Sequence, residues 1–93
     1  MKDLIYVVED DEGMQEVYQG AFEENYDTRI FSTGREFFEA FNEKKPDLII
    51  LDIMLPEKDG FTVLSEIREK DEKVPVICVS AKSDEISFVK GLN

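Results

Sequence analysis

Hydrophobic residues occur along the chain in short runs that alternate with amphipathic stretches. Four runs have the composition of β-strands, at residues 4–8, 28–31, 48–51 and 76–79. Three of them are continuously apolar, which is typical of strands covered on both faces of a parallel sheet. The run at residues 28–31 is shorter and partly polar, which favours an edge of the sheet.

The stretches between the strands have helical spacing. Residues 13–22 and 60–70 each carry one apolar stripe, and a last amphipathic segment begins near residues 83–85. The apolar side chains that we expect on the inward faces of these segments are Met14, Val17, Tyr18, Ala21, Phe22, Phe61, Leu64, Ile67, Ile86, Val89 and Leu92.

Another helix follows the second strand. It begins at a Ser32 or Thr33 cap, and Pro46 closes its exit. Three phenylalanines mark its buried side, at Phe37, Phe38 and Phe41. Strand and helix therefore alternate four times, which predicts an α/β fold: an open parallel sheet with helices on both faces, joined by right-handed crossovers.

The charge balance limits the possible partners. Asp and Glu number 22 against 11 Lys and Arg, so the formal net charge is −11. An acidic surface repels phosphates, which argues against binding to nucleic acid or to an anionic membrane. The chain contains no histidine. Ser-His-Asp catalysis, histidine-ligated zinc and a phosphohistidine step within this chain are therefore excluded.

The expected location is a reducing cytoplasm. The single cysteine, Cys78, lies in an apolar run and cannot form an internal disulfide. No apolar run exceeds five residues, and the N-terminus lacks the apolar region of a signal peptide. These features predict one small cytoplasmic domain with no membrane association.

Oxygen-bearing side chains follow three of the apolar strands. Glu9 and Asp10 follow the first, Asp52 the third and Ser80 the fourth. Function in an open parallel sheet collects at the carboxyl ends of the strands, and neighbouring strands lie about 4.8 Å apart. If these strands are adjacent, we expect their terminal side chains to share one ligand.

The acidic cluster has two interpretations. Acids that precede a helix can cap it and complement its dipole, which accounts for Asp11 and Glu12. Capping does not account for Glu9 and Asp10 at the end of a buried strand, opposite a third carboxylate at Asp52. Crowded carboxylates repel each other unless a cation lies between them. Oxygen ligands favour Mg²⁺, with Mn²⁺ or Ca²⁺ behind it.

Asp52 lies within an apolar run, where an unpartnered charge is costly. It could cap the following turn, although Pro56 and three intervening apolar residues weaken that interpretation. A carboxylate beside Mg²⁺ is also suited to act as a nucleophile toward phosphorus.

The residues after the fourth strand have weaker signals. Ser80 alone reads as a loop hydroxyl, but next to Asp52 it could hydrogen-bond a phosphoryl oxygen, with the small Ala81 leaving room. Lys58 and Lys82 read as solvated loop charges that could turn toward an anion. Gly60 is assigned to the turn that enters a helix rather than to the chemistry.

Three segments together resemble the receiver domain of two-component response regulators. They are residues 7–11, 51–60 and 76–81, and the resemblance covers essentially the whole chain. It implies a flavodoxin-like fold, of which residues 1–93 supply (βα)4 of a (βα)5 domain that is truncated at its C-terminus. The segment around residues 53–56 most resembles receivers that precede a winged-helix DNA-binding domain and regulate transcription.

The resemblance also implies roles for individual residues. Asp52 would be the phosphoacceptor, receiving a phosphoryl group from a sensor histidine kinase or from a small acyl phosphate. Asp10 and Asp52 would bind Mg²⁺ directly, with the Met54 carbonyl as a third ligand and Glu9 acting through water.

The same resemblance implies that Ser80, with Ala81 beside it, binds the phosphoryl group and acts as the switch hydroxyl. Met54 and Lys82 would occupy the positions that tune hydrolysis of the aspartyl phosphate. No lysine of this chain is assigned the family's phosphate-binding role, because that role belongs to a fifth strand that would follow.

One expectation follows from the sheet itself. If residues 76–79 form its second edge, their uncharged backbone groups are open to pairing with another chain. This predicts a homodimer through that edge, or exchange of the last segment.

Two further function classes remain as alternatives to a phosphoacceptor. One is a receiver-like interaction domain that is never phosphorylated. The other is a metal-dependent hydrolase of the aspartyl-phosphate type, although Met54 stands where such enzymes carry a second aspartate. A flavin-binding protein of the same fold is disfavoured, because no Ser/Thr/Gly-rich phosphate loop follows the first strand.

Overall fold

The computed structural model describes residues 2–55, 59–79 and 89–90. Through residue 79 the strands and helices alternate as the sequence pattern predicts, and residues 89–90 form a short strand. In chain order the elements are β1 (Asp3–Val8), α1 (Glu12–Phe22), β2 (Tyr26–Phe31), α2 (Gly34–Glu43), β3 (Leu48–Asp52), α3 (Gly60–Lys70), β4 (Val76–Val79) and β5 (Val89–Lys90).

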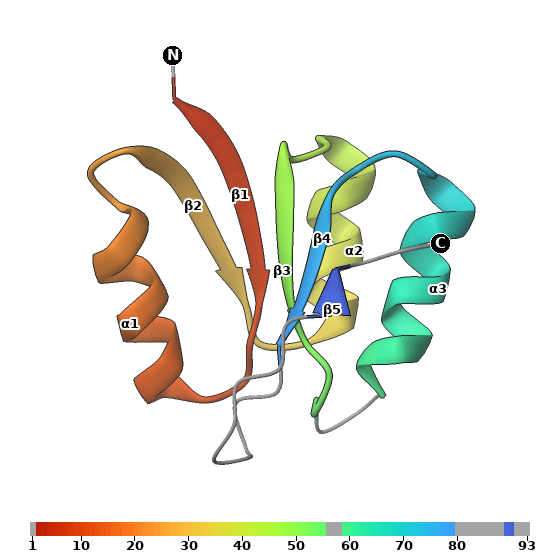
Figure 1. The fold of residues 1–93 in the computed structure, drawn as a ribbon, viewed down its shortest axis with the longest axis horizontal. Coiled ribbons are helices and arrows are strands. Elements are labelled where there is room, and N and C mark those ends of the chain that lie inside the picture. Colours follow the sequence, from red (N-terminus) through yellow and green to blue (C-terminus); the bar gives the residue numbers. More distant parts are fainter. Residues whose placement is uncertain (1, 56–58, 80–88, 91–93) are drawn as a thin grey trace.

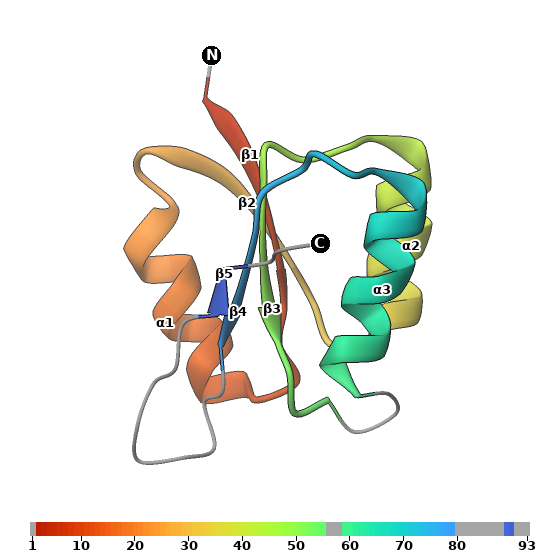
Figure 2. The ribbon, with the colours of Figure 1, turned by 45° about the vertical axis from the view of Figure 1, so that its right-hand side comes forward.

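The strands form a single sheet in the order β2-β1-β3-β4-β5. The first four are parallel, as expected, and β2 lies at one edge. Figures 1 and 2 show the three layers: α1 covers one face of the sheet, and α2 and α3 cover the other. The predicted α/β fold with helices on both faces is therefore confirmed.

The larger part of the core lies between the sheet and the helices α2 and α3. Phe37 is fully buried there, with its ring centroid 4.9 Å from that of Phe38 and 5.4 Å from that of Phe41. Tyr6 of β1 is also fully buried, and its hydroxyl donates to the carbonyl of Lys44 at 2.9 Å. The predicted phenylalanine face of α2 is confirmed, and Thr33 is the cap.

The smaller part of the core lies under α1, where β1 and β3 present apolar residues that include Val7 and Ile50. Tyr18 and Phe22 pack against it and are only partly buried. The predictions that Val17 and Ala21 point inward are wrong, because both are exposed, Val17 over 58% of its surface. The inward stripe of α1 is thus narrower than the distribution of apolar residues suggests.

Helix α3 has the predicted bounds but a different inward face. Val63 and Ile67 are fully buried one turn apart, and Leu64 packs beside them. Phe61, which was expected to face the core, is 48% exposed. The reason is geometric: the buried Gly60 begins the inward row, and the next residue lies about 100° around the helix.

The last segment also differs from expectation. Val89–Lys90 form a strand that pairs antiparallel with Ile77 and Cys78 of β4, rather than part of a helix. Backbone groups at a sheet edge gain by pairing, and a β-branched valine suits a strand. The edge that was expected to be open is therefore paired at these two residues. A homodimer, through a sheet edge or by exchange of the last segment, stays a prediction.

Candidate phosphoacceptor site

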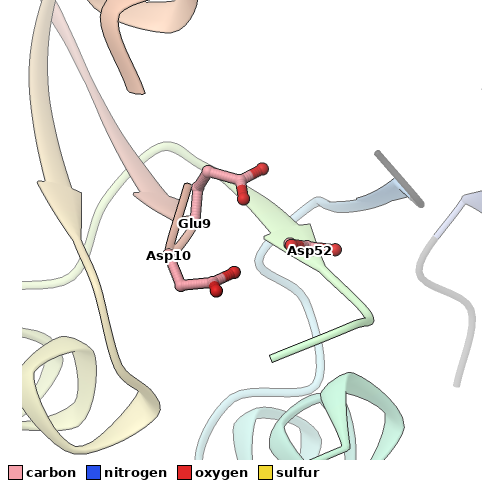
Figure 3. Close-up of side chains that lie close together, drawn as sticks. All are labelled: Glu9, Asp10 and Asp52. Carbon is pink, nitrogen blue, oxygen red and sulfur yellow. The ribbon is translucent and has the colours of Figure 1, made fainter. Parts of the chain in front are cut away.

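Parallel pairing of β1 with β3 brings the predicted carboxylates together. The last pair in the register is Val8 with Leu51, so the next residue along each strand is Glu9 and Asp52. Side chains alternate between the two faces of a sheet, so Glu9 and Asp52 point to the same face as Val7 and Ile50, the pair two positions earlier. Figure 3 shows Glu9, Asp10 and Asp52 gathered at the carboxyl end of the sheet.

The three carboxylates can present their oxygens to a common point. One oxygen from each of Glu9, Asp10 and Asp52 lies within 4.8 Å of the other two. Glu9 and Asp52 are buried, with 0% and 1% of their surfaces exposed, and Asp10 is half-buried. Glu9 Oε1, Asp10 Oδ1 and Asp52 Oδ2 are buried and have no hydrogen-bond partner among the described residues. A group of unpartnered buried acceptors fits a cation, so this cluster could hold a metal ion.

Burial sets the protonation of Glu9. It raises the pKa of this carboxyl from 4.5 to about 7, and the nearby Asp52 and Asp10 add to the increase. A hydrogen bond of 3.2 Å from the Asp11 N–H to Glu9 Oε2 acts in the opposite direction. When ionised, Glu9 and Asp52 are both acceptors and can hydrogen-bond to each other only through a shared proton. A proton or a cation is therefore needed between them.

The Asp52 carboxylate is oriented by the turn that follows it. Its Oδ1 accepts from the Met54 N–H at 2.9 Å, so the alternative role of capping the turn accounts for one oxygen and leaves the other unpartnered. Met54 is 47% exposed beside the site and bridges to Asp59 across the loop.

Gly60 closes this loop against the end of β3. Its N–H donates to the Ile53 carbonyl at 3.0 Å, and a Cβ on it would lie 2.2 Å from Ile53 Cα and 2.8 Å from the Asp52 carbonyl oxygen. The sequence interpretation of Gly60 as a turn residue is supported, and the close approach to Asp52 shows why only glycine fits.

Asp11 belongs to the helix rather than to the cluster. It is the N-cap of α1, and its Oδ2 accepts from the Met14 N–H at 3.0 Å. Glu12 follows in the first turn of α1. The capping interpretation of these two acids is thus supported, and it separates them from the three carboxylates at the strand ends.

Several predicted residues fall outside the part of the chain that the structure describes. They are Lys58, Ser80, Ala81, Lys82, Ile86 and Leu92. Conversely, patterning along the chain does not identify two α1 residues that interact with members of the cluster. Burial raises the pKa of Tyr18, and the charges of Glu9 and Asp52 raise it further. The Gln15 side chain contacts the Glu9 backbone. Helical spacing alone marks both only as positions on a helix.

The family is decided by a match that covers nearly the whole chain. The sequence model of the response regulator receiver domain matches residues 5–93. The chain belongs to this family. It is therefore a receiver domain, a signalling domain, as the three motif segments predicted.

Curated relatives are longer proteins that regulate transcription. The transcriptional regulatory protein PcoR of Escherichia coli is 39% identical over 89 residues, which are 95% of this chain and 39% of that protein. CssR of Bacillus subtilis is 40% identical over 93 residues, 99% of this chain and 41% of that protein. The chain thus spans about two-fifths of the length of these relatives.

Solved receiver structures share the fold. The non-phosphorylated receiver domain of HemR from Leptospira biflexa superposes with a TM-score of 0.80 at 29% identity, covering 90% of this chain and 68% of that one. The response regulator Rcp1 gives a TM-score of 0.77 at 25% identity, with 89% of this chain and 68% of that one covered.

Among the described residues, no helix is both long enough and apolar enough to span a membrane.

Proposed function

We propose that this receiver domain accepts a phosphoryl group on Asp52 from a sensor histidine kinase. The observation that carries the proposal is the buried Asp52 carboxylate, held through one oxygen by the Met54 N–H and unpartnered at the other. A carboxylate that is oriented but not neutralised is available as a nucleophile.

The transfer balances as a simple displacement at phosphorus. An oxygen of Asp52 forms the new P–O bond, and the P–N bond of a phosphohistidine, or the P–O bond of an acyl phosphate, breaks. The leaving group keeps the bonding electron pair. No histidine is present in this chain, so the donor residue belongs to a partner.

Mg²⁺ is the cofactor that we assign to this step. Its ligands would be Asp10, Asp52 and the Met54 carbonyl, with Glu9 acting through water, and the unpartnered oxygens of the three acids fit a hard cation. When bound, Mg²⁺ offsets the charge that builds up on the phosphoryl oxygens. The Rcp1 structure is of an Mn²⁺-bound form, which supports a divalent cation as the ligand that we assign.

The roles of the remaining residues are carried over from the family resemblance. Ser80, beside Ala81, would bind the phosphoryl group and switch conformation, while Met54 and Lys82 would tune hydrolysis. Curated relatives that match this chain are transcriptional regulators, so we infer that the phosphorylated state controls transcription through a partner domain.

Intact-mass measurement tests the phosphoacceptor directly. The protein is incubated with acetyl phosphate and Mg²⁺, and the wild type should gain one phosphoryl group that Asp52→Asn does not gain. Asp27→Asn, at an exposed position of β2, is the matched control and should be phosphorylated like the wild type. An adduct that persists in Asp52→Asn would place the phosphoryl group elsewhere. An unmodified wild type would favour the interaction domain, and continuous phosphate release without a stable adduct would favour the hydrolase.

A further inference from the structure

The side chain of Gln15 links three segments beside the carboxylate cluster. Its Nε2 donates to the backbone carbonyl of Glu9 at 2.6 Å and to Ser32 Oγ at 3.1 Å. A carbonyl oxygen can only accept, so the amide nitrogen must face Glu9, and its two N–H groups account for both contacts. The amide therefore has a fixed orientation between the end of β1 and the loop that precedes α2.

The carbonyl that Gln15 contacts lies just beyond the end of β1. Strand pairing continues as far as the Glu9 N–H, which donates to the Phe31 carbonyl at 2.9 Å. The next peptide group joins Glu9 to Asp10, and it is planar, so the orientation of its carbonyl also fixes where the Asp10 Cα lies. Gln15 thus supplies the hydrogen bond to the Glu9 carbonyl that a neighbouring strand would supply inside the sheet. This carbonyl lies between Glu9 and Asp10, two of the three clustered acids.

Both ends of this link are anchored. The Gln15 N–H donates to the carbonyl of Asp11, the N-cap of α1, at 2.9 Å. The Ser32 N–H donates to Glu36 Oε1 at 3.2 Å, and the Glu36 N–H donates to Thr33 Oγ1 at 3.2 Å. Thr33 is the N-cap of α2, so these bonds resemble a capping box in which the Glu36 carboxylate accepts from the residue before the cap. The first turn of α1 and the segment that caps α2 therefore fix the Gln15 side-chain amide, and this amide in turn binds the Glu9 carbonyl.

We propose that Gln15 is a positioning residue of the phosphoacceptor site, which sets the geometry of Glu9 and Asp10 through the peptide between them. The proposal rests on the proposed function, because it concerns the affinity of that site for Mg²⁺. Groups that orient metal ligands without touching the metal commonly change metal affinity by about 10–100-fold when they are removed. Gln15 acts on the backbone of the ligands rather than on their carboxylates.

A purely structural role would give a different result. A hydrogen bond to a partly buried carbonyl contributes modestly to folding, and its loss would lower the melting temperature without altering the metal site. The discriminating measurement is therefore the Mg²⁺ dissociation constant of the folded protein, compared with its melting temperature.

The experiment titrates Mg²⁺ into wild-type, Gln15→Met and Gln19→Met proteins by NMR. Gln15→Met keeps the length of the side chain and removes both donors. Gln19 lies one turn further along α1, is exposed and is the matched control. We expect the dissociation constant of Gln15→Met to rise about tenfold or more, and that of Gln19→Met to stay unchanged. In the metal-free protein, the Asp10 amide nitrogen should also shift in Gln15→Met, because its peptide carbonyl loses a donor.

Gln15→Glu keeps the proposal testable if Gln15→Met unfolds. It adds a negative charge beside the cluster, which by electrostatics alone would tighten Mg²⁺ binding, whereas loss of the two donors would weaken it. A raised dissociation constant supports positioning, and an unchanged or lowered one overturns it. Wild-type protein that binds no Mg²⁺ would overturn the metal assignment and this proposal together. Equal binding by wild type and Gln15→Met would overturn only the role of Gln15.

Discussion

Glu9 and Asp52 end neighbouring parallel strands and place carboxylate oxygens within 4.8 Å of each other in a buried environment. Neither Glu9 Oε1 nor Asp52 Oδ2 has a hydrogen-bond partner in the part of the chain that the structure describes. Two like charges at this separation destabilise the fold unless a proton or a cation intervenes. The site is therefore a place where protonation, metal binding and stability are linked.

The first prediction concerns pH. The pKa of Glu9 is raised from 4.5 to about 7, mainly by burial, so the folded state binds more protons than the unfolded state between these values. Stability from this group is complete below about pH 4.5 and is lost as the pH rises through 7. Without divalent cations, the free energy of unfolding should fall by up to about 3 kcal/mol across this range.

Urea denaturation in EDTA at a series of pH values measures this loss. Glu9→Gln, which cannot ionise, should remove this part of the pH dependence, while other carboxylates still destabilise both proteins in acid. A difference between wild type and Glu9→Gln that stays constant from pH 4.5 to 8 would contradict the raised pKa of Glu9.

The second prediction concerns Mg²⁺. A cation offsets the repulsion between the clustered acids, so Mg²⁺ should raise the melting temperature. The increase should be larger at pH 8 than at pH 6, because the cation competes with the proton on Glu9. Asp10→Asn should reduce the increase, and Asp27→Asn on β2 should leave it unchanged. Equal increases for wild type and Asp10→Asn, measured by calorimetry, would remove Asp10 from the metal site.

Much of this site was predictable because the apolar pattern shows where the strands lie and where they end. Apolar runs predicted β1, β3 and β4, and parallel strands end at the same edge of a sheet. The acids that follow β1 and β3 meet because these two strands are neighbours in the sheet, a condition that the patterning itself left open. Gln15 was not predictable in the same way, because its role depends on a backbone carbonyl that it reaches only after α1 packs against the sheet.

The errors in the sequence interpretation also have physical causes. Helical spacing identifies which residues share a face, but not which part of that face the sheet covers, so Val17 and Phe61 were wrongly placed inside. The strand at Val89–Lys90 depends on the open edge of β4, which is tertiary information. Apolar residues alone allow either a helix or a strand in a segment this short.

The third prediction uses two glycines with opposite surroundings. A Cβ at Gly60 would lie 2.2 Å from Ile53 Cα, and backbone atoms cannot move aside cheaply, so Gly60→Ala should destabilise the protein by about 2–3 kcal/mol. Movement of the backbone at Asp52 and Ile53 to make room for the new methyl group should also weaken Mg²⁺ binding, because the Asp52 carbonyl oxygen is in the same contact.

Gly20 provides the control. It lies in α1 with no heavy atom of the surrounding described residues within 4 Å of its added Cβ, so Gly20→Ala should stabilise the protein by about 0.5–1 kcal/mol through helix propensity. Urea denaturation of both variants measures the two signs. Equal effects would show that the Gly60 contact is not a packing constraint.

The fourth prediction compares two phenylalanines that the sequence pattern treats alike. Phe37 is completely buried, with 0% of its surface accessible, and the aromatic rings of Tyr6 and Phe38 pack against it. Phe37→Ala should therefore cost about 3–5 kcal/mol, enough to abolish the cooperative transition of a small domain. Phe61 keeps 48% of its surface exposed, so Phe61→Ala should cost less than about 1 kcal/mol. Urea denaturation of both variants decides the matter: similar losses would mean that Phe61 packs into the core as its helical spacing suggested, and would reverse the inward face assigned to α3.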